Sequence, residues 1–319
     1  MEQLTGRLQE DRRILDTLLG AGRNYDVINR DLEIGQRRAR LYVIDGYGDD
    51  GVIERITSFL LGPGAKLGEE AEDMAAFVRR CITFCEVECQ SDLQKIATGA
   101  FLGKTVLLVE GFAQCALMDA KKFPGRGVEE PADARVLRGS HDGFTETLVQ
   151  NTALLRRRIR DTHLTLEAHK VGGRSQTDVV MAFLEGQADP AEVQTLRSKL
   201  DAIDVGSISM SQESVPEAIM PRQWYNPFPK VRYTERPDAA TAALMEGGIV
   251  LLVDNSPSVM LLPTSFFDFM EETNDYYFPP LVGTYLRYLR ITVMLLSLLI
   301  TPLWFLLVKD PSRVPGFLS

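Results

Sequence analysis

Hydrophobic and polar residues along this chain follow patterns that predict alternating helices and strands. Apolar residues recur at helical spacing over residues 8–34, which predicts one or two helices broken at Gly20–Gly22. A short apolar run over 41–45 predicts a strand, and residues 49–61 return to helical spacing. A further helix is predicted over 144–160, where it would connect two lobes. The pattern therefore favours an α/β fold.

The second half of the chain repeats the first. Residues 103–111 match residues 247–255, which lie 144 positions further along, and both segments contain Val-Leu-Leu-Val. Each copy leads to a second apolar run through Glu110-Gly111 or Asp254-Asn255, which are typical of tight hairpin turns. Upstream, residues 44–46 match residues 184–186, and a helix over 190–203 follows the second copy.

This repeat predicts two related α/β subdomains in tandem, each running strand, helix, strand, helix and hairpin. The alternative is that two unrelated hairpins contain the same short apolar sequence. We divide the chain into an N-terminal helical segment (1–37), a first subdomain (38–125), a linker loop and connecting helix (126–165), a second subdomain (166–275), a membrane segment (281–308) and a tail (309–319).

The membrane segment ends in a run of uncharged residues, 291–308. At about 1.5 Å per residue, a helix of this length nearly spans a hydrocarbon core of about 30 Å. An amphipathic stretch over 281–290 leads into it, and the tyrosines around it suit the membrane interface. The sequence therefore predicts one transmembrane helix near the C-terminal end of the chain.

Composition and charge limit the partners and the compartment. The net charge of -9 argues against a nucleic-acid partner held through phosphates. The N-terminal sequence has no apolar signal region, and the four cysteines do not have the number or spacing of a secreted disulfide framework. We therefore expect the region before the membrane helix to be cytoplasmic.

The sequence does not assemble a catalytic, cofactor-binding or metal site, and we expect that the protein is not an enzyme. Residues 98–105 end in Gly-Lys-Thr like a phosphate-binding loop, but Thr98 replaces the first glycine and the segment precedes a strand. A helix-to-strand turn is favoured there. Three cysteines spaced by four lack a fourth metal ligand, so we expect buried thiols at Cys81, Cys85 and Cys89. The histidines lack partners at ligand spacing and favour surface positions: His141, His163 and His169.

Two charged clusters suit contact surfaces. Arg156–Arg158 form a basic helix end, which either complements the helix dipole or contacts an acidic neighbour or a lipid headgroup. Residues 232–238 combine helix-start chemistry, in which Thr234 can act as the cap, with rings and guanidinium groups that suit a subdomain or subunit interface.

Several ordered motifs resemble the GerA family of spore germination proteins. They span residues 140–146, 151–160, 171–178, 226–238, 253–259 and 275–277. The resemblance implies a cytoplasmic region of two subdomains, several transmembrane helices and a place in the spore inner membrane. It also implies subunits that form an oligomeric, ion-conducting ring, with nutrient recognition usually assigned to a partner subunit. Because this chain stops at Ser319 after one membrane helix, we expect its multi-pass membrane domain to be truncated.

The resemblance thus implies a germination-complex subunit that releases ions or relays and amplifies the germination signal. The alternatives are a non-conducting scaffold that clusters other germination proteins and, third, a membrane-tethered enzyme or nucleotide-binding protein. Expected partners are further copies of the chain, other germination membrane proteins and membrane lipid. The family-motif residues that we expect at interfaces are Arg138, His141, Asp142, Phe144, Arg156, Arg157, Arg158, Arg174, Asp178, Asn226, Arg232, Tyr233, Glu235, Arg236, Asp254, Tyr276 and Tyr277.

Overall fold

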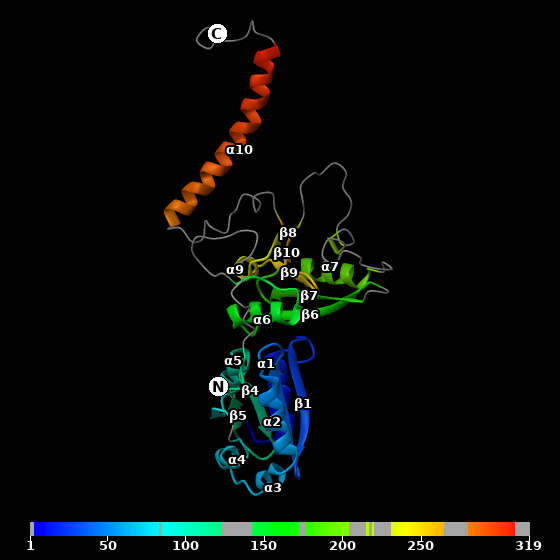
Figure 1. Ribbon diagram of the computed structural model, residues 1–319, viewed down its shortest axis with the longest axis vertical. Helices are drawn as coiled ribbons and strands as arrows, with labels where there is room; N and C mark the ends of the chain where they lie inside the picture. The colour runs from blue at the N-terminus through cyan, green and yellow to red at the C-terminus, as the bar shows by residue number, and fades with distance from the viewer. Residues whose placement is uncertain are drawn as a thin grey trace. The chain divides into compact units, whose positions relative to one another are not determined.

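The computed structural model contains two five-stranded antiparallel sheets with the same topology (Figure 1). It describes residues 3–82, 85–122, 142–172, 176–203, 215–216, 219, 231–264 and 280–309. The strand orders are β1-β2-β4-β5-β3 in the first sheet and β6-β7-β9-β10-β8 in the second. The expected α/β fold with two related subdomains is therefore confirmed, and we call the two subdomains lobe 1 and lobe 2.

Lobe 1 places its sheet between two layers of helices. One face packs on α1 and α5, and the other packs on α2, α3 and α4. Its elements are α1 (Leu8–Leu19), β1 (Val27–Ile34), β2 (Arg37–Ile44), α2 (Asp50–Leu61), α3 (Gly64–Glu69), α4 (Met74–Cys81), β3 (Val87–Gln90), α5 (Leu93–Phe101), β4 (Thr105–Val109) and β5 (Cys115–Met118).

Lobe 2 repeats this arrangement with fewer helices in the described residues. Helices α6 and α9 cover one face of its sheet, and α7 covers the other. Its elements are α6 (Leu148–Arg158), β6 (Leu164–Val171), β7 (Thr177–Leu184), α7 (Pro190–Asp201), β8 (Arg232–Thr234), α9 (Pro237–Met245), β9 (Ile249–Val253) and β10 (Val259–Leu262).

The repeat extends to individual hydrogen bonds. Asp11 in α1 accepts from the backbone N–H and the hydroxyl of Thr5, and Asn151 in α6 does the same with Thr145. The first hairpin bonds back to this turn through Gly111 N–H and Gly6 O, and the second hairpin does so through Asn255 N–H and Glu146 O. Helices α1 and α6 therefore hold equivalent positions in the two lobes.

The helix prediction for residues 8–34 is wrong beyond Leu19. The helix ends at Gly20, which adopts the left-handed conformation, and residues 27–34 form strand β1 instead. The apolar residues Val27, Leu32 and Ile34 also fit a strand, and eight-residue pairing with β2 decides between the two conformations. Each lobe thus begins with a helix that the sequence predicted, α1 or α6, and a strand that it did not, β1 or β6.

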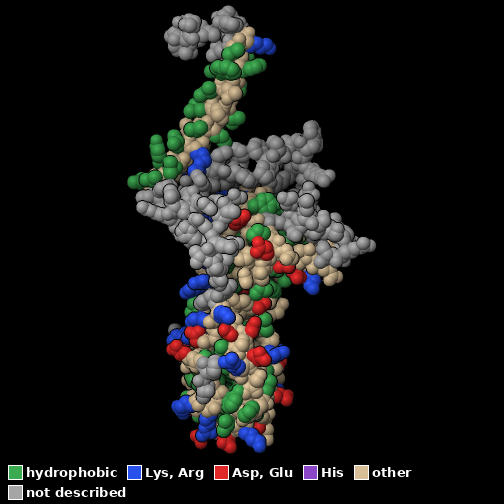
Figure 2. Space-filling model, viewed as in Figure 1, with side chains coloured by type: hydrophobic (Ala, Val, Ile, Leu, Met, Phe, Trp, Pro, Cys, Tyr) green, Lys and Arg blue, Asp and Glu red, His purple; other side chains and the backbone are tan. Residues whose placement is uncertain are grey.

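Helix α10 (Pro280–Lys309) forms a separate unit of the structure. The segment from Leu281 to Leu306 is the one described helix that is long and apolar enough to cross a membrane, with a mean hydropathy of 2.0. Figure 2 shows hydrophobic side chains along it. This agrees with the predicted transmembrane helix.

Candidate functional site

The described family-motif residues lie mainly inside lobe 2, where they connect its elements. Phe144 is buried and its N–H donates to Glu235 O, while Arg158 pairs with Asp142 at 2.6 Å. Asp254, which follows β9, connects two other elements: its N–H donates to Asp178 O of β7, and its Oδ1 accepts from Leu148 N–H at the start of α6. Arg236, just before α9, pairs with Asp238 in the first turn of that helix. Arg232 and Tyr233 lie in edge strand β8, and Arg157 is an exposed residue of α6. The remaining motif residues lie outside the described part of the chain: Arg138, His141, Arg174, Asn226, Tyr276 and Tyr277.

Arg156 reaches across to lobe 1. Its Nε and Nη2 donate to the two carboxylate oxygens of Asp26, each at 2.9 Å, and its Nη1 donates to Leu164 O. Its guanidinium carbon lies 4.7 Å from the centre of the Phe101 ring. The side chains of Arg156 and Asp26 are 0% and 3% exposed, so this bidentate ion pair is almost fully removed from water.

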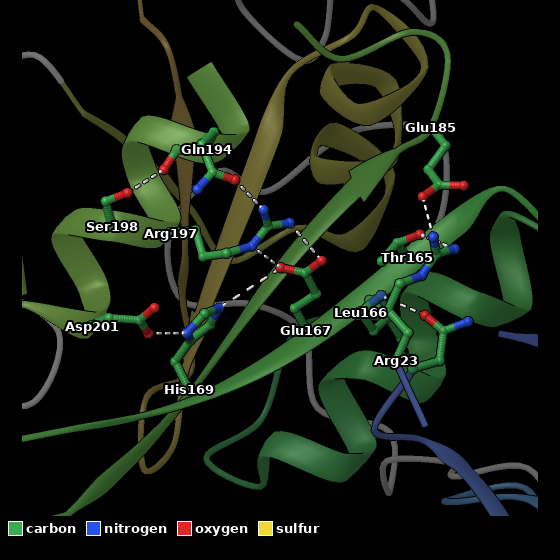
Figure 3. A network of polar contacts seen from close by, with 11 residues as sticks. Arg23, Thr165, Leu166, Glu167, His169, Glu185, Gln194, Arg197, Ser198 and Asp201 are labelled. Carbon is green, nitrogen blue, oxygen red and sulfur yellow. Dashed lines mark hydrogen bonds and ion pairs between the residues drawn. The ribbon is translucent and has the colours of Figure 1, made fainter. Parts of the chain in front are cut away.

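The loop between α1 and β1 bonds to the edge of lobe 2. Tyr25 N–H donates to Leu166 O at 3.1 Å, and Leu166 N–H donates to the side chain of Asn24 at 2.9 Å. Arg23 pairs with Glu185 and also donates to Thr165 (Figure 3). The loop therefore supplies hydrogen-bond partners for the backbone N–H and C=O of Leu166 in edge strand β6. At an open sheet edge these groups would have no partner in the sheet.

A close backbone contact completes the joint. Gly46 has a φ of +77°, and a Cβ added there would lie 3.0 Å from Val149 and 3.1 Å from Ala153 of α6. The Tyr47 hydroxyl donates to Ala153 O at 3.2 Å, and the Tyr25 hydroxyl lies 2.6 Å from that of Thr152. We call the contacts of residues 23–26, 46–47 and 101 with α6 and the β6 edge the inter-lobe joint.

Burial keeps the joint's tyrosines neutral. It raises the pKa of both Tyr25 and Tyr47 well above the ordinary value, so each hydroxyl keeps its proton. Burial also raises the pKa of the Asp45 carboxyl beside the Gly46 turn. The joint is thus a polar contact with the buried Arg156–Asp26 ion pair inside it and the exposed Arg23–Glu185 pair at its rim.

A second polar network lies next to the joint, between β6 and α7 (Figure 3). Arg197 donates to both oxygens of Glu167, at 2.8 and 2.9 Å, and His169 Nδ1 lies 2.9 Å from Asp201. His169 is nine-tenths buried, which corrects the surface position expected for it, whereas His163 is exposed. This network fastens α7 to the strand that the joint contacts.

The structure shows no cluster of three metal-ligating side chains in the part of the chain that it describes. Cys81 is buried and Cys85 and Cys89 are half-buried, each with a pKa raised by burial. Gly103 follows α5 and precedes β4, so the Gly-Lys-Thr segment is the expected helix-to-strand turn. The helix-to-strand turn and the burial of Cys81 are as expected, whereas Cys85 and Cys89 are less buried than expected.

Sequence reasoning identified Arg156 and missed its partner. Asp26 and the preceding loop fell inside a predicted helix, and the ion pair joins residues 130 positions apart. A usable signal was the polar stretch Arg-Asn-Tyr-Asp directly after a glycine break.

Comparison with known proteins identifies relatives. The family model described as "Bacillus/Clostridium GerA spore germination protein" matches residues 13–318. The chain is 38% identical to stage V sporulation protein AF of Bacillus subtilis over 297 residues, which cover 93% of this chain and 60% of that protein. It is 26% identical to spore germination protein KA of the same organism, covering 90% of this chain and 53% of that protein.

A solved structure has the same fold. The N-terminal domain of the A subunit of the Bacillus megaterium spore germinant receptor GerK3 matches with a TM-score of 0.63 and 25% identity. The match covers 83% of this chain and 98% of that domain. This chain spans 60% or less of the length of the two sequence relatives described above.

Proposed function

Because this chain belongs to the GerA family of spore germination proteins, we propose that it is a subunit of an oligomeric germination complex in the spore inner membrane. In this proposal the two lobes face the cytoplasm and α10 enters the membrane. The complex releases ions, or relays and amplifies the germination signal, and it contains further copies of the chain together with other germination membrane proteins. In this proposal the protein has no enzymatic activity.

The inter-lobe joint is the observation that supports this role most directly. The two lobes meet through a buried ion pair, a few hydrogen bonds and the packing of Ala153 and Tyr25, each on the core of the opposite lobe. These directional bonds give the contact a preferred geometry, so a change in one lobe can alter the position of the other. A signal relay needs this property, whereas a passive anchor does not.

The test compares this chain with a longer one that carries the further membrane helices of its relatives. Mass by light scattering in detergent and conductance in planar bilayers are measured for both. Discrete oligomers with conductance in the longer chain would support the proposal. Discrete oligomers without conductance would favour a scaffold that clusters other germination proteins, and monomers from both chains would refute self-assembly.

A second test uses spores. Asp26→Asn in the gene for the longer chain removes the negative partner of Arg156 from the joint and changes no residue of the membrane domain. We expect slower ion release and slower germination at equal protein abundance. Germination at the parental rate would show that the joint carries no signal.

A further inference from the structure

Lobe 1 has a surface that α6 covers, and the equivalent surface of lobe 2 is open. In lobe 1 the surface consists of Gly46, Tyr47 and Phe101, and both rings are 1% exposed. In lobe 2, Gly186 follows strand β7 as Gly46 follows β2, with a similar φ of +82°, and Met245 ends α9 as Phe101 ends α5. The equivalent residues of lobe 2 are Gly186, Gln187 and Met245.

The open surface has room for another chain. A Cβ added at Gly186 would meet no atom within 4 Å, whereas one at Gly46 would touch α6. Gln187 is exposed, and Met245 is 56% exposed although it occupies the position of a buried phenylalanine. Glu246 extends this surface and is also exposed. We call residues 185–187, Met245 and Glu246 the open surface.

Helix α1 has the complementary uncovered face. It occupies in lobe 1 the position of α6 in lobe 2, as the matching Asp11 and Asn151 bonds show. The α6 residues that lie on Gly46 are Val149 and Ala153, and their equivalents in α1 are Gln9 and Arg13. Gln9 and Arg13 are both exposed.

The charges of the two uncovered surfaces are opposite. The face of α1 presents Arg13, which is exposed and for which the structure records no ion pair with a described residue. Arg12 beside it is 44% exposed but already pairs with Asp16 and Asp31 of its own lobe, so Arg13 is the charge that remains for a partner. The open surface presents Glu246 and Glu185, of which Glu185 also pairs with Arg23. Opposite charges around an apolar centre at Met245 favour association with the correct partner and disfavour other faces.

We propose that the open surface of lobe 2 binds helix α1 of a second copy of this chain, as lobe 1 binds α6 within one copy. This inference rests on the proposed function, because it names the surface through which the oligomeric complex assembles. The contact joins two different surfaces, so each added copy leaves one free surface of each kind. Association therefore continues head to tail until the assembly closes.

Cross-linking tests the placement. Gln9→Cys is made in one batch of the full chain and Gln187→Cys in another, both with Cys85→Ala and Cys89→Ala to remove the half-buried native thiols. Under mild oxidation in detergent, the mixture is expected to form a cross-linked dimer that neither batch forms alone. An absence of dimer from a mixture that still oligomerises would overturn the proposed surface.

Charge reversal tests the energetics. Arg13→Glu and Glu246→Arg are each expected to weaken association by about tenfold, and combining them is expected to recover much of the loss. Arg30→Glu, at an exposed position of β1 outside both surfaces, is the control and should leave association unchanged. If association is unchanged by Arg13→Glu, by Glu246→Arg and by their combination, this surface is refuted and the proposed function stands. A parent chain that is monomeric while the longer chain oligomerises would refute this surface alone, and monomers from both chains would count against both proposals.

Discussion

The buried ion pair between Asp26 and Arg156 gives a measurable prediction about the joint. Asp26→Ala leaves a guanidinium group that is 0% exposed without its counter-charge. Removing one partner of a buried pair costs about 3–5 kcal/mol, because the remaining charge stays out of water. We expect Asp26→Ala, and likewise Arg156→Met, to destabilise the protein by this amount.

The double variant separates the charge effect from the loss of contacts. Asp26→Ala with Arg156→Met leaves no uncompensated charge, and apolar replacement of a buried pair costs about 1 kcal/mol or less. The methionine can keep its packing on the Phe101 ring, where the guanidinium now lies. The double variant should therefore be more stable than either single variant.

The matched control is the ion pair of Arg40 with Asp31 inside lobe 1. Arg40 is also buried, but Asp31 is 64% exposed, and Arg40 keeps contacts with Asp16 and Tyr42 when Asp31 is changed. Asp31→Asn should therefore cost less than about 1 kcal/mol. Urea unfolding of the full chain in detergent, followed by circular dichroism, gives all four values. If Asp26→Ala costs no more than Asp31→Asn, the ion pair does not hold the lobes together.

The structure makes three further predictions. Gly46→Ala should lower the free energy of unfolding by about 1 kcal/mol more than Gly186→Ala does, because both positions have positive φ but only Gly46 touches α6. Urea unfolding at a dilution where the chain is monomeric measures both variants. Equal losses would contradict the close contact. Cys115, whose pKa burial raises to about 12, should resist iodoacetamide at pH 8 in the folded chain while Cys85 reacts, as peptide mass spectrometry can check. Burial also raises the pKa of Tyr25, Tyr42 and Tyr47, so these hydroxyls lose their protons at lower pH in the unfolded chain than in the folded one. The stability of the fold should therefore be intact below about pH 10 and fall above it. A titration followed at 295 nm should show no ionisation of these three tyrosines until the chain unfolds.

The two hairpins and the main helix starts could be predicted from local sequence. The Val-Leu-Leu-Val runs form the central strands β4 and β9, which are buried along their whole length. Asp49 and Asp189 cap α2 and α7 by accepting backbone N–H bonds, so those helices begin where the pattern indicated. Each of these features depends on residues close together in the chain.

Edge strands and the joint depend on contacts that local sequence does not show. Strand β1 carries exposed charges at Arg30, Asp31 and Glu33, which interrupt apolar alternation and protect the sheet edge. Its conformation comes from pairing with β2 rather than from its own pattern. The joint pairs Asp26 of one lobe with Arg156 of the other, 130 positions away in the chain, so the sequence could identify the arginine motif but not its partner.

Comparison of equivalent positions shows why the lobes contact each other as they do. Both lobes have the same sheet order, and in both the first helix accepts a bond from the threonine before it, at Asp11 and at Asn151, so the fold by itself would make their surfaces alike. They differ where α6 meets lobe 1: Arg156 occupies the position of Asp16, and Phe101 occupies that of Met245. Asp16 bonds within its own lobe, to the Tyr42 hydroxyl at 2.8 Å, whereas Arg156 bonds to the other lobe.

The joint therefore arises from a few side-chain differences imposed on a duplicated fold. Exchanging these side chains should weaken the joint without unfolding either lobe, because each lobe keeps its own two apolar cores. The duplication also leaves the equivalent surfaces on α1 and on lobe 2 uncovered in the described residues, with Arg13 exposed on the first and Glu246 on the second. In the assembly proposed above, the geometry that joins the lobes within one chain also joins one chain to the next, so a displacement of one lobe would reach the neighbouring subunit.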